Sequence, residues 1–336
     1  MPVSQTQLTE ITRKNRVQLV RPAYVSYGHP NLNEAERFAK DFGLVDSPTE
    51  AESTVPVRYF RGYGDQPLVY VVVQTDAPEF LGVTFEAQSM EDLKKAAAIP
   101  GASKIEKMDH QPGGGQRVTI RDPDNLPFHV IFGQKLLDRI EPTPQVDPFN
   151  YPAQTDEDTE KKPRRGRFQR PQRGPAPVHK LGHCGYVVSD LWRSVTFYTT
   201  HFSFAKSDSV ANPVVEGESA LVFLHVDKGK FFTDHHAFFL AVKMPDQQLG
   251  PHHAAFEVHD FDVQQIAHYF LKSKGYKPQW GVGRHRPGSQ IFDYWFDLSG
   301  FVLEHYCDGD LVNEDTTFRE YHLGETDSWG PETPFL

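Results

Sequence analysis

Short apolar runs and amphipathic stretches alternate in a repeating order in the first half of the chain. One amphipathic stretch runs from Leu32 to Gly43 and a second begins at Ser89. Apolar residues recur there every three to four positions, which favours helices, while the short apolar runs between them favour strands. These runs lie at 24–27, 67–73, 82–87, 117–121 and 128–132. The first half is therefore predicted to contain two modules, each with a strand, a helix and further strands.

The second half repeats this order. Helical periodicity follows Asp190, a good helix N-cap residue, and returns at 263–270 before Gly275. The segment AYVSYGHPNLNEAERFAKDFGLV aligns with HCGYVVSDLWRSVTFYTTHFSFA, and RDPDNLPFHVIF aligns with FDLSGFVLEHY. The apolar runs of this half lie at 183–188, 220–226, 236–242, 253–258, 290–296 and 301–306. Such internal similarity predicts a duplicated domain.

The two halves are separated by a stretch rich in proline and charge. Residues 135–178 contain an acidic block followed by a basic block, a composition typical of solvated, extended chain. A basic block can also bind nucleic acid, but only Phe168 interrupts this one, and the net charge of −10 argues against a nucleic-acid partner. We expect a first domain at 19–134, a linker at 135–178, a second domain at 179–308 and a tail at 309–336.

Composition narrows the class of protein. Hydrophobic residues make up 38% of the 336 residues and charged residues 24%, as in globular proteins. Two cysteines, Cys184 and Cys307, exclude a disulfide scaffold and CxxC zinc sites. No apolar run approaches the length of about 18 residues that a membrane helix needs, and the N-terminus has no apolar signal core. We expect a cytoplasmic protein with no membrane partner.

Most of the 16 histidines follow residue 178, and three polar residues of that half stand at equivalent places on repeated strands. His183 and His253 each open a strand, and Glu304 lies on the last one. In a curved sheet these positions can converge as two imidazoles and one carboxylate, the facial triad of mononuclear metal sites. The alternative is three unrelated, solvated side chains. The matching residues of the first half are Tyr24, Gly82 and His129, a set that chelates poorly, so only the second half is expected to bind metal.

The segment GRHRPGSQIFDYWFDLSGFVLE, residues 283–304, resembles the signature of type I extradiol ring-cleaving dioxygenases. Asp293 and Leu298 depart from that signature, at positions that carry no catalytic group. The segments LGHCGYVVSD and GPHHAAFEV resemble the two histidine-bearing strands of the same family. The residues that fit the signature are Gly283, His285, Tyr294, Asp297, Gly300 and Glu304. The specific resemblance covers 179–308, whereas 19–134 matches only the general vicinal oxygen chelate pattern.

This resemblance implies a fold and a set of roles. The fold is α+β, with two vicinal oxygen chelate domains, each made of two βαβββ modules that form a curved mixed sheet around a cavity. His183, His253 and Glu304 match the metal ligands, and His285 and Tyr294 match groups that hydrogen-bond substrate oxygens. His236 matches the acid–base histidine, although its neighbour His235 stays open as the alternative.

Weaker candidates for substrate binding are His235, Arg284, Arg286 and Phe202. The arginines would suit a substrate carboxylate, but solvated loop charges explain them equally well. Phe202 would line an aromatic pocket, with packing in the core as the alternative. The tail at 309–336 could fold over the pocket mouth.

The implied reaction is extradiol (meta) cleavage of a catechol-type aromatic by O₂. It takes place at a mononuclear non-haem metal, Fe(II) or alternatively Mn(II), and gives a ring-opened semialdehyde or keto acid. The implied partners are a small catecholic substrate, O₂ and further copies of the chain in a homo-oligomer. Two alternatives stay open. One is a non-oxidative, metal-dependent enzyme of the glyoxalase or hydrolase kind, and the other is a metal-free protein that binds an aromatic ligand.

Overall fold

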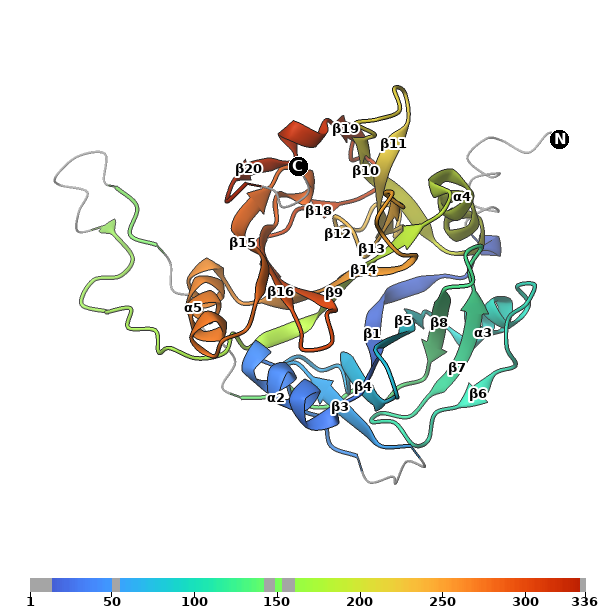
Figure 1. Cartoon of the computed structure of the whole chain (residues 1–336), viewed down its shortest axis with the longest axis horizontal. Helices are drawn as coiled ribbons and strands as arrows, with labels where there is room; N and C mark the ends of the chain where they lie inside the picture. The colour runs from blue at the N-terminus through green and yellow to red at the C-terminus, as the bar shows by residue number, and fades with distance from the viewer. Residues whose placement is uncertain (1–13, 50–54, 142–148, 153–160, 333–336) are drawn as a thin grey trace.

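The computed structural model describes residues 14–49, 55–141, 149–152 and 161–332. Two large mixed sheets dominate these residues, one from each half of the chain, and their long first strands β1 (Leu19–His29) and β9 (Val178–Val188) pass close to each other (Figure 1). The helices lie on the outside of the sheets. The predicted α+β class is confirmed.

The first sheet has eight strands in the order β2-β3-β4-β1-β5-β8-β7-β6. Its helices are α2 (Leu32–Phe42) and α3 (Met90–Ala97). The remaining strands are β2 (Val45–Asp46), β3 (Val57–Arg61), β4 (Tyr70–Gln74), β5 (Glu79–Ala87), β6 (Glu106–Lys107), β7 (Gln116–Arg121) and β8 (Pro127–Phe132).

The second sheet has ten strands in the order β19-β10-β11-β13-β9-β14-β17-β16-β15-β20, and β12 pairs with β18 beside it. Its α-helices are α4 (Leu191–His201) and α5 (Phe261–Ser273), and two short 3₁₀ turns, η2 (Pro287–Ser289) and η3 (Leu323–Glu325), lie in its loops. The strands are β10 (Phe204–Ala211), β11 (Ser219–Val226), β12 (Thr233–Asp234), β13 (Phe238–Val242), β14 (Gly250–Val258), β15 (Pro278–His285), β16 (Ile291–Phe296), β17 (Val302–Cys307), β18 (Leu311–Val312), β19 (Arg319–Tyr321) and β20 (Asp327–Trp329).

The same pairing scheme organises both sheets. β1 runs parallel to β4 and antiparallel to β5, and β9 runs parallel to β13 and antiparallel to β14. The third equivalent pairing is also shared, because β5 pairs in parallel with β8 as β14 does with β17. β1 and β9 even share one burial pattern over their 11 residues. The predicted duplication of paired βαβββ modules is confirmed.

Local capping explains where the helices begin and end. The Asn31 side chain accepts hydrogen bonds from the first backbone N–H groups of α2, and Gly43 ends that helix at φ 112°, a conformation that glycine adopts without steric cost. Ser89 caps α3 through the Asp92 N–H, and Asp190 caps α4 through the Arg193 N–H. The predicted helix starts are therefore confirmed.

Several strands of the second sheet lie in polar sequence and were not predicted from the apolar runs. β10 reads FAKSDSVA, with no run of apolar residues, yet its central residues Ser207, Asp208 and Ser209 are buried because β11 and β19 flank the strand. β18, β19 and β20 come from the polar tail and pair with β12, β10 and β15. The tail thus adds strands to the second sheet, at both of its edges.

Aromatic side chains fill the space between the two halves. Phe128 of β8 lies 4.8 Å from Phe202 and 5.8 Å from Phe238, ring centre to ring centre, and the Tyr186 hydroxyl donates to the Pro127 carbonyl at 2.6 Å.

Residues 161–177 contain no α-helix or strand. The division at 19–134, 135–178, 179–308 and 309–336 stays a prediction. In the described residues, no helix has the length and apolar character needed to cross a membrane.

Candidate metal centre

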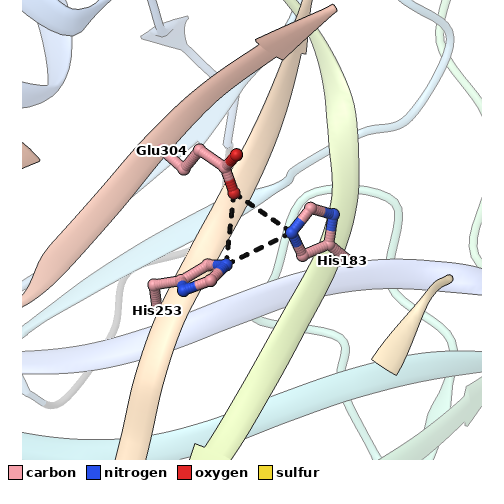
Figure 2. A group of neighbouring side chains, drawn as sticks. All are labelled: His183, His253 and Glu304. Carbon is pink, nitrogen blue, oxygen red and sulfur yellow. Dashed lines mark hydrogen bonds and ion pairs between the residues drawn. The ribbon is translucent and has the colours of Figure 1, made fainter. Parts of the chain in front are cut away.

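Three buried side chains converge on the inner face of the second sheet: His183, His253 and Glu304 (Figure 2). The Nε2 atoms of the two histidines lie 3.2 Å apart. Glu304 Oε2 lies 3.1 Å from Nε2 of His183 and 3.2 Å from Nε2 of His253. All three residues are at most 6% exposed. The three residues that the sequence singled out therefore form one cluster.

The sheet brings them together because β9, β14 and β17 are adjacent strands. Ala255 of β14 stands opposite His183 on one side and opposite Glu304 on the other. The pairing of β9 with β14 is irregular at Gly182 and at His252, and such β-bulges redirect neighbouring side chains. Glycine is needed at position 182, since a Cβ there would lie 1.9 Å from the Tyr306 hydroxyl. The bulges thus set the direction from which both imidazoles enter the cluster.

The electrostatics of the cluster suit a cation. Burial alone would raise the pKa of Glu304, but its contacts with His183 and His253 outweigh burial and lower that pKa. Burial lowers the pKa of His253, against the effect of Glu304. Among the described residues, neither Glu304 oxygen has a hydrogen-bond partner with good geometry. The lowered pKa keeps this buried carboxylate ionised, and a buried anion calls for a positive partner.

The spacing of the donor atoms fits a metal ion. Bonds of about 2.1 Å at right angles separate neighbouring ligand atoms by about 3 Å, close to the 3.1–3.2 Å observed here. The His253 ring is also supported on the side away from the cluster, because its Nδ1 lies 2.9 Å from Nδ1 of His252. Support of this kind orients histidine ligands in metal proteins. The residues present therefore fit a mononuclear site with two imidazoles and one carboxylate.

Tyr294 and His285 lie on one side of the cluster. The Tyr294 hydroxyl is 3.0 Å from His285 Nε2, and its ring is 5.0 Å from that of His253. His285 Nδ1 lies 2.7 Å from Asp327 Oδ1, on the tail strand β20. Burial, followed by the Glu304 charge, raises the pKa of Tyr294 well above its ordinary value. The sequence identified His285 and Tyr294 but not Asp327, which lies in a tail without a recognisable motif.

His235 and His236 lie on another side. The ring of His236 is centred 4.1 Å from the ring of His183. His235 instead points toward Asp208, and its Nε2 lies 2.8 Å from Asp208 Oδ2. The two neighbours touch through their Nδ1 atoms at 3.0 Å. Burial and then the imidazole of His183 hold the pKa of His236 well below its ordinary value. Of the two histidines that the sequence could not separate, His236 is the one packed against the cluster.

The weaker candidates are placed less favourably. The Arg284 guanidinium already donates to the Ser289 carbonyl and to Asp308, both at 2.7 Å. Arg286 donates its backbone N–H to Thr326, which ties η2 to the tail. Phe202 is fully buried among Phe128 and other core rings between the halves, so its geometry gives no support to a substrate role.

In the first half, the equivalent positions form no cluster of ligands. The strand registers place Tyr24, Gly82 and His129 where His183, His253 and Glu304 stand in the second sheet. Tyr24 bonds to Gln111, and His129 bonds to Thr119 and to the Leu81 carbonyl. A Cβ at Gly82 would lie 2.5 Å from His129 Nε2, so the ring of His129 takes the space that a side chain at position 82 would need.

A separate cavity of about 330 Å³ opens between β1 and β9. Arg21, Lys180 and Asp234 line it, and none of the candidate site residues does. Its charges are largely paired within the protein, with Lys180 2.5 Å from Asp234 and Arg21 2.9 Å from Glu86. Its lining therefore differs from that of the candidate site.

Comparison with known proteins supports the resemblance. Residues 180–304 match the model of the glyoxalase/bleomycin resistance protein/dioxygenase superfamily. Metapyrocatechase 2 of Cupriavidus necator is 26% identical over 98% of this chain and 97% of its own length. The predicted resemblance to extradiol dioxygenases is thereby confirmed.

Solved structures share the fold. Homoprotocatechuate 2,3-dioxygenase of Brevibacterium fuscum, in complex with 3,4-dihydroxyphenylacetate, superposes with a TM-score of 0.73 at 17% identity, over 94% of this chain and 90% of that one. The Mn(II)-bound glyoxalase of Novosphingobium aromaticivorans gives 0.72 at 20% identity, over 95% and 93%. At such identities the likeness establishes the fold and leaves the chemistry to be argued from the site.

Proposed function

We propose that this chain catalyses extradiol cleavage of a catechol-type aromatic by O₂, giving a ring-opened semialdehyde or keto acid. The observation that carries the proposal is the buried cluster of His183, His253 and Glu304, with His236 on one side and Tyr294 with His285 on another. A relative named metapyrocatechase, similar over nearly the whole length, supports the same activity.

The three clustered residues would be the metal ligands, and Fe(II) is the proposed metal, with Mn(II) as the alternative. Imidazole and carboxylate donors suit both ions. When bound, the metal would supply Lewis acidity toward the catechol hydroxyls and a route for electrons between catechol and O₂. We also propose that the chain works as a homo-oligomer, which light scattering on the purified protein would test.

Tyr294 and His285 would hold the substrate oxygen. Asp327 can only accept a hydrogen bond when ionised, so His285 places its proton on Nδ1 and, when neutral, offers Nε2 as an acceptor. The Tyr294 hydroxyl then donates to Nε2. Its raised pKa keeps this hydroxyl protonated, and its oxygen lone pairs are left to accept the hydroxyl proton of a catechol.

His236 would move protons. Its lowered pKa keeps the imidazole neutral near pH 7, so one ring nitrogen has a lone pair that can accept a hydrogen bond or a proton as charge develops during the reaction. The ring lies against His183, next to the cluster. Positioned groups of this kind contribute about 10²–10⁴-fold to rate.

Oxygen consumption is the decisive measurement. Protein reconstituted with Fe(II) under anaerobic conditions is mixed with catechol, 3-methylcatechol, 2,3-dihydroxybiphenyl or 3,4-dihydroxyphenylacetate. We expect one O₂ consumed per yellow product with at least one of them, and no consumption by the Glu304→Ala variant. Tight catechol binding without oxygen uptake would instead favour a binding protein. Turnover of a thiol adduct or ester without oxygen would favour the non-oxidative alternative.

A further inference from the structure

A chain of three buried side chains leads away from the candidate centre. His236 Nδ1 contacts His235 Nδ1 at 3.0 Å, and His235 Nε2 contacts Asp208 Oδ2 at 2.8 Å. All three residues are at most 6% exposed. Asp208 comes from β10 and the two histidines from the segment between β12 and β13, so the contacts depend on the fold rather than on local sequence.

The chemistry of the three groups fixes the direction of the hydrogen bonds. An ionised carboxylate accepts only, so His235 donates its Nε2–H to Asp208. When His235 carries a single ring proton, its Nδ1 has a lone pair, and the contact between the two Nδ1 atoms then requires that His236 donate its Nδ1–H. His236 is left with a lone pair on Nε2, the ring nitrogen that His235 does not use.

We propose that Asp208 is a positioning residue that acts through His235 and holds His236 in the Nδ1–H tautomer, with Nε2 free to take a proton. The proposal rests on the proposed function, because it matters for turnover only if His236 is the acid–base group. His235 is then the connector between carboxylate and base, rather than a substrate contact.

The surroundings hold this chain in place. The Ser207 hydroxyl donates to the His235 carbonyl, and the backbone N–H of His235 donates to the Asp310 carbonyl at 2.9 Å. Gly288 packs against the His235 ring so closely that a Cβ there would lie 2.8 Å from Nδ1. The ring therefore has little room to leave Asp208.

The second oxygen of Asp208 makes asparagine an informative replacement. Oδ1 accepts the backbone N–H of Arg319, on tail strand β19, at 3.0 Å. An asparagine must keep its carbonyl at that N–H, so its NH₂ group faces His235. His235 then has to accept at Nε2 and carry its proton on Nδ1, which forces His236 to carry its own proton on Nε2. Asp208→Asn thus reverses the direction of the whole chain while it preserves the shape of the side chain.

The test combines a spectroscopic and a kinetic measurement on the full chain. Histidine-labelled ¹⁵N protein reconstituted with diamagnetic Zn(II) reports which ring nitrogen of His236 carries the proton, with His236→Gln used to assign its signals. We expect Nδ1–H in the wild type and Nε2–H in Asp208→Asn. With Fe(II) and a catechol, kcat of Asp208→Asn should fall about 10²–10⁴-fold while KM changes by less than about threefold.

Glu320→Gln is the matched control. Glu320 lies beside Arg319 on β19 and accepts from Ser209 of β10 at 3.2 Å, so it probes the same strand contact without touching His235. We expect the wild-type tautomer and the wild-type kcat in this control.

The proposal is overturned if His236 carries its proton on Nε2 in the wild type, or if its tautomer is the same in wild type and Asp208→Asn. The wild-type spectrum decides even where the variant does not fold. Absence of oxygen uptake by the wild type with every catechol would reject the proposed function instead, and the tautomer comparison would still stand on its own.

Discussion

The buried carboxyl of Asp293 is expected to lower the free energy of unfolding as pH rises. This fully buried residue of β16 stands where the resembled signature has an apolar residue, and burial raises the pKa of its carboxyl to about 6 from an unfolded value near 3.8. Its Oδ1 contacts His268 Nδ1 at 2.9 Å, and its Oδ2 accepts from the Trp295 indole at 2.7 Å. A folded pKa above the unfolded one means that the folded state binds the proton more tightly.

The sign and size follow from this difference. Folding favours the protonated carboxyl, so the stability contributed by this group is present below pH 4 and is lost as pH rises to about 6. A difference of about 2 pKa units corresponds to about 3 kcal/mol. Asparagine avoids that loss, since its carbonyl can accept from Trp295 and its NH₂ can donate to His268 in the other tautomer. We expect Asp293→Asn to be about 3 kcal/mol more stable than wild type at pH 7 and nearly equal to it at pH 4.

The assay is urea unfolding of metal-free protein between pH 4 and 7, followed by tryptophan fluorescence. The difference between variant and wild type is the quantity compared, because other carboxyls titrate in both proteins. Asp246→Asn, a change at an exposed carboxylate, serves as the control and should show no such trend. Equal unfolding midpoints for wild type and Asp293→Asn at pH 7, or a gap that widens on acidification, would refute the reasoning.

Three further predictions concern the centre itself. Glu304→Ala should lose the roughly one Fe or Mn per chain expected in the wild type, and full metal content in the variant by mass spectrometry would reject the ligand set. Tyr294→Phe should keep its metal, while kcat in the oxygen-uptake assay falls about 5–150-fold, the equivalent of one hydrogen bond of about 1–3 kcal/mol; an unchanged kcat would contradict its role. Asp327→Asn should also keep its metal and lose turnover, since it removes the charged acceptor that holds the Nδ1–H of His285 and through it the hydrogen bond to Tyr294. An unaltered rate would show that the tail carboxylate is not needed.

The core of the centre was predictable because it rests on repetition. His183, His253 and Glu304 each occupy a strand position that recurs in the other half, and adjacent strands of one sheet must bring such positions together. The helix starts were predictable for a local reason, since a cap such as Asp190 acts within three residues.

The supporting residues were not predictable, because their partners are distant. Asp208 lies on a strand without an apolar pattern, and its link to Arg319 spans 111 residues. Asp327 reaches His285 only after β20 has paired with β15. Phe202 was a candidate for a substrate pocket but packs against Phe128 of the other half. The local sequence does not determine whether an aromatic ring at the end of a helix faces a pocket or the neighbouring half.

The first half has consequences for how this protein can change. Gly82 has φ 110°, which disfavours any other residue, and a histidine there would collide with the ring of His129. His129 cannot simply be replaced either, since it satisfies Thr119 and the Leu81 carbonyl. Changes toward a metal ligand at position 82 or 129 would therefore cost stability before a second metal site could form.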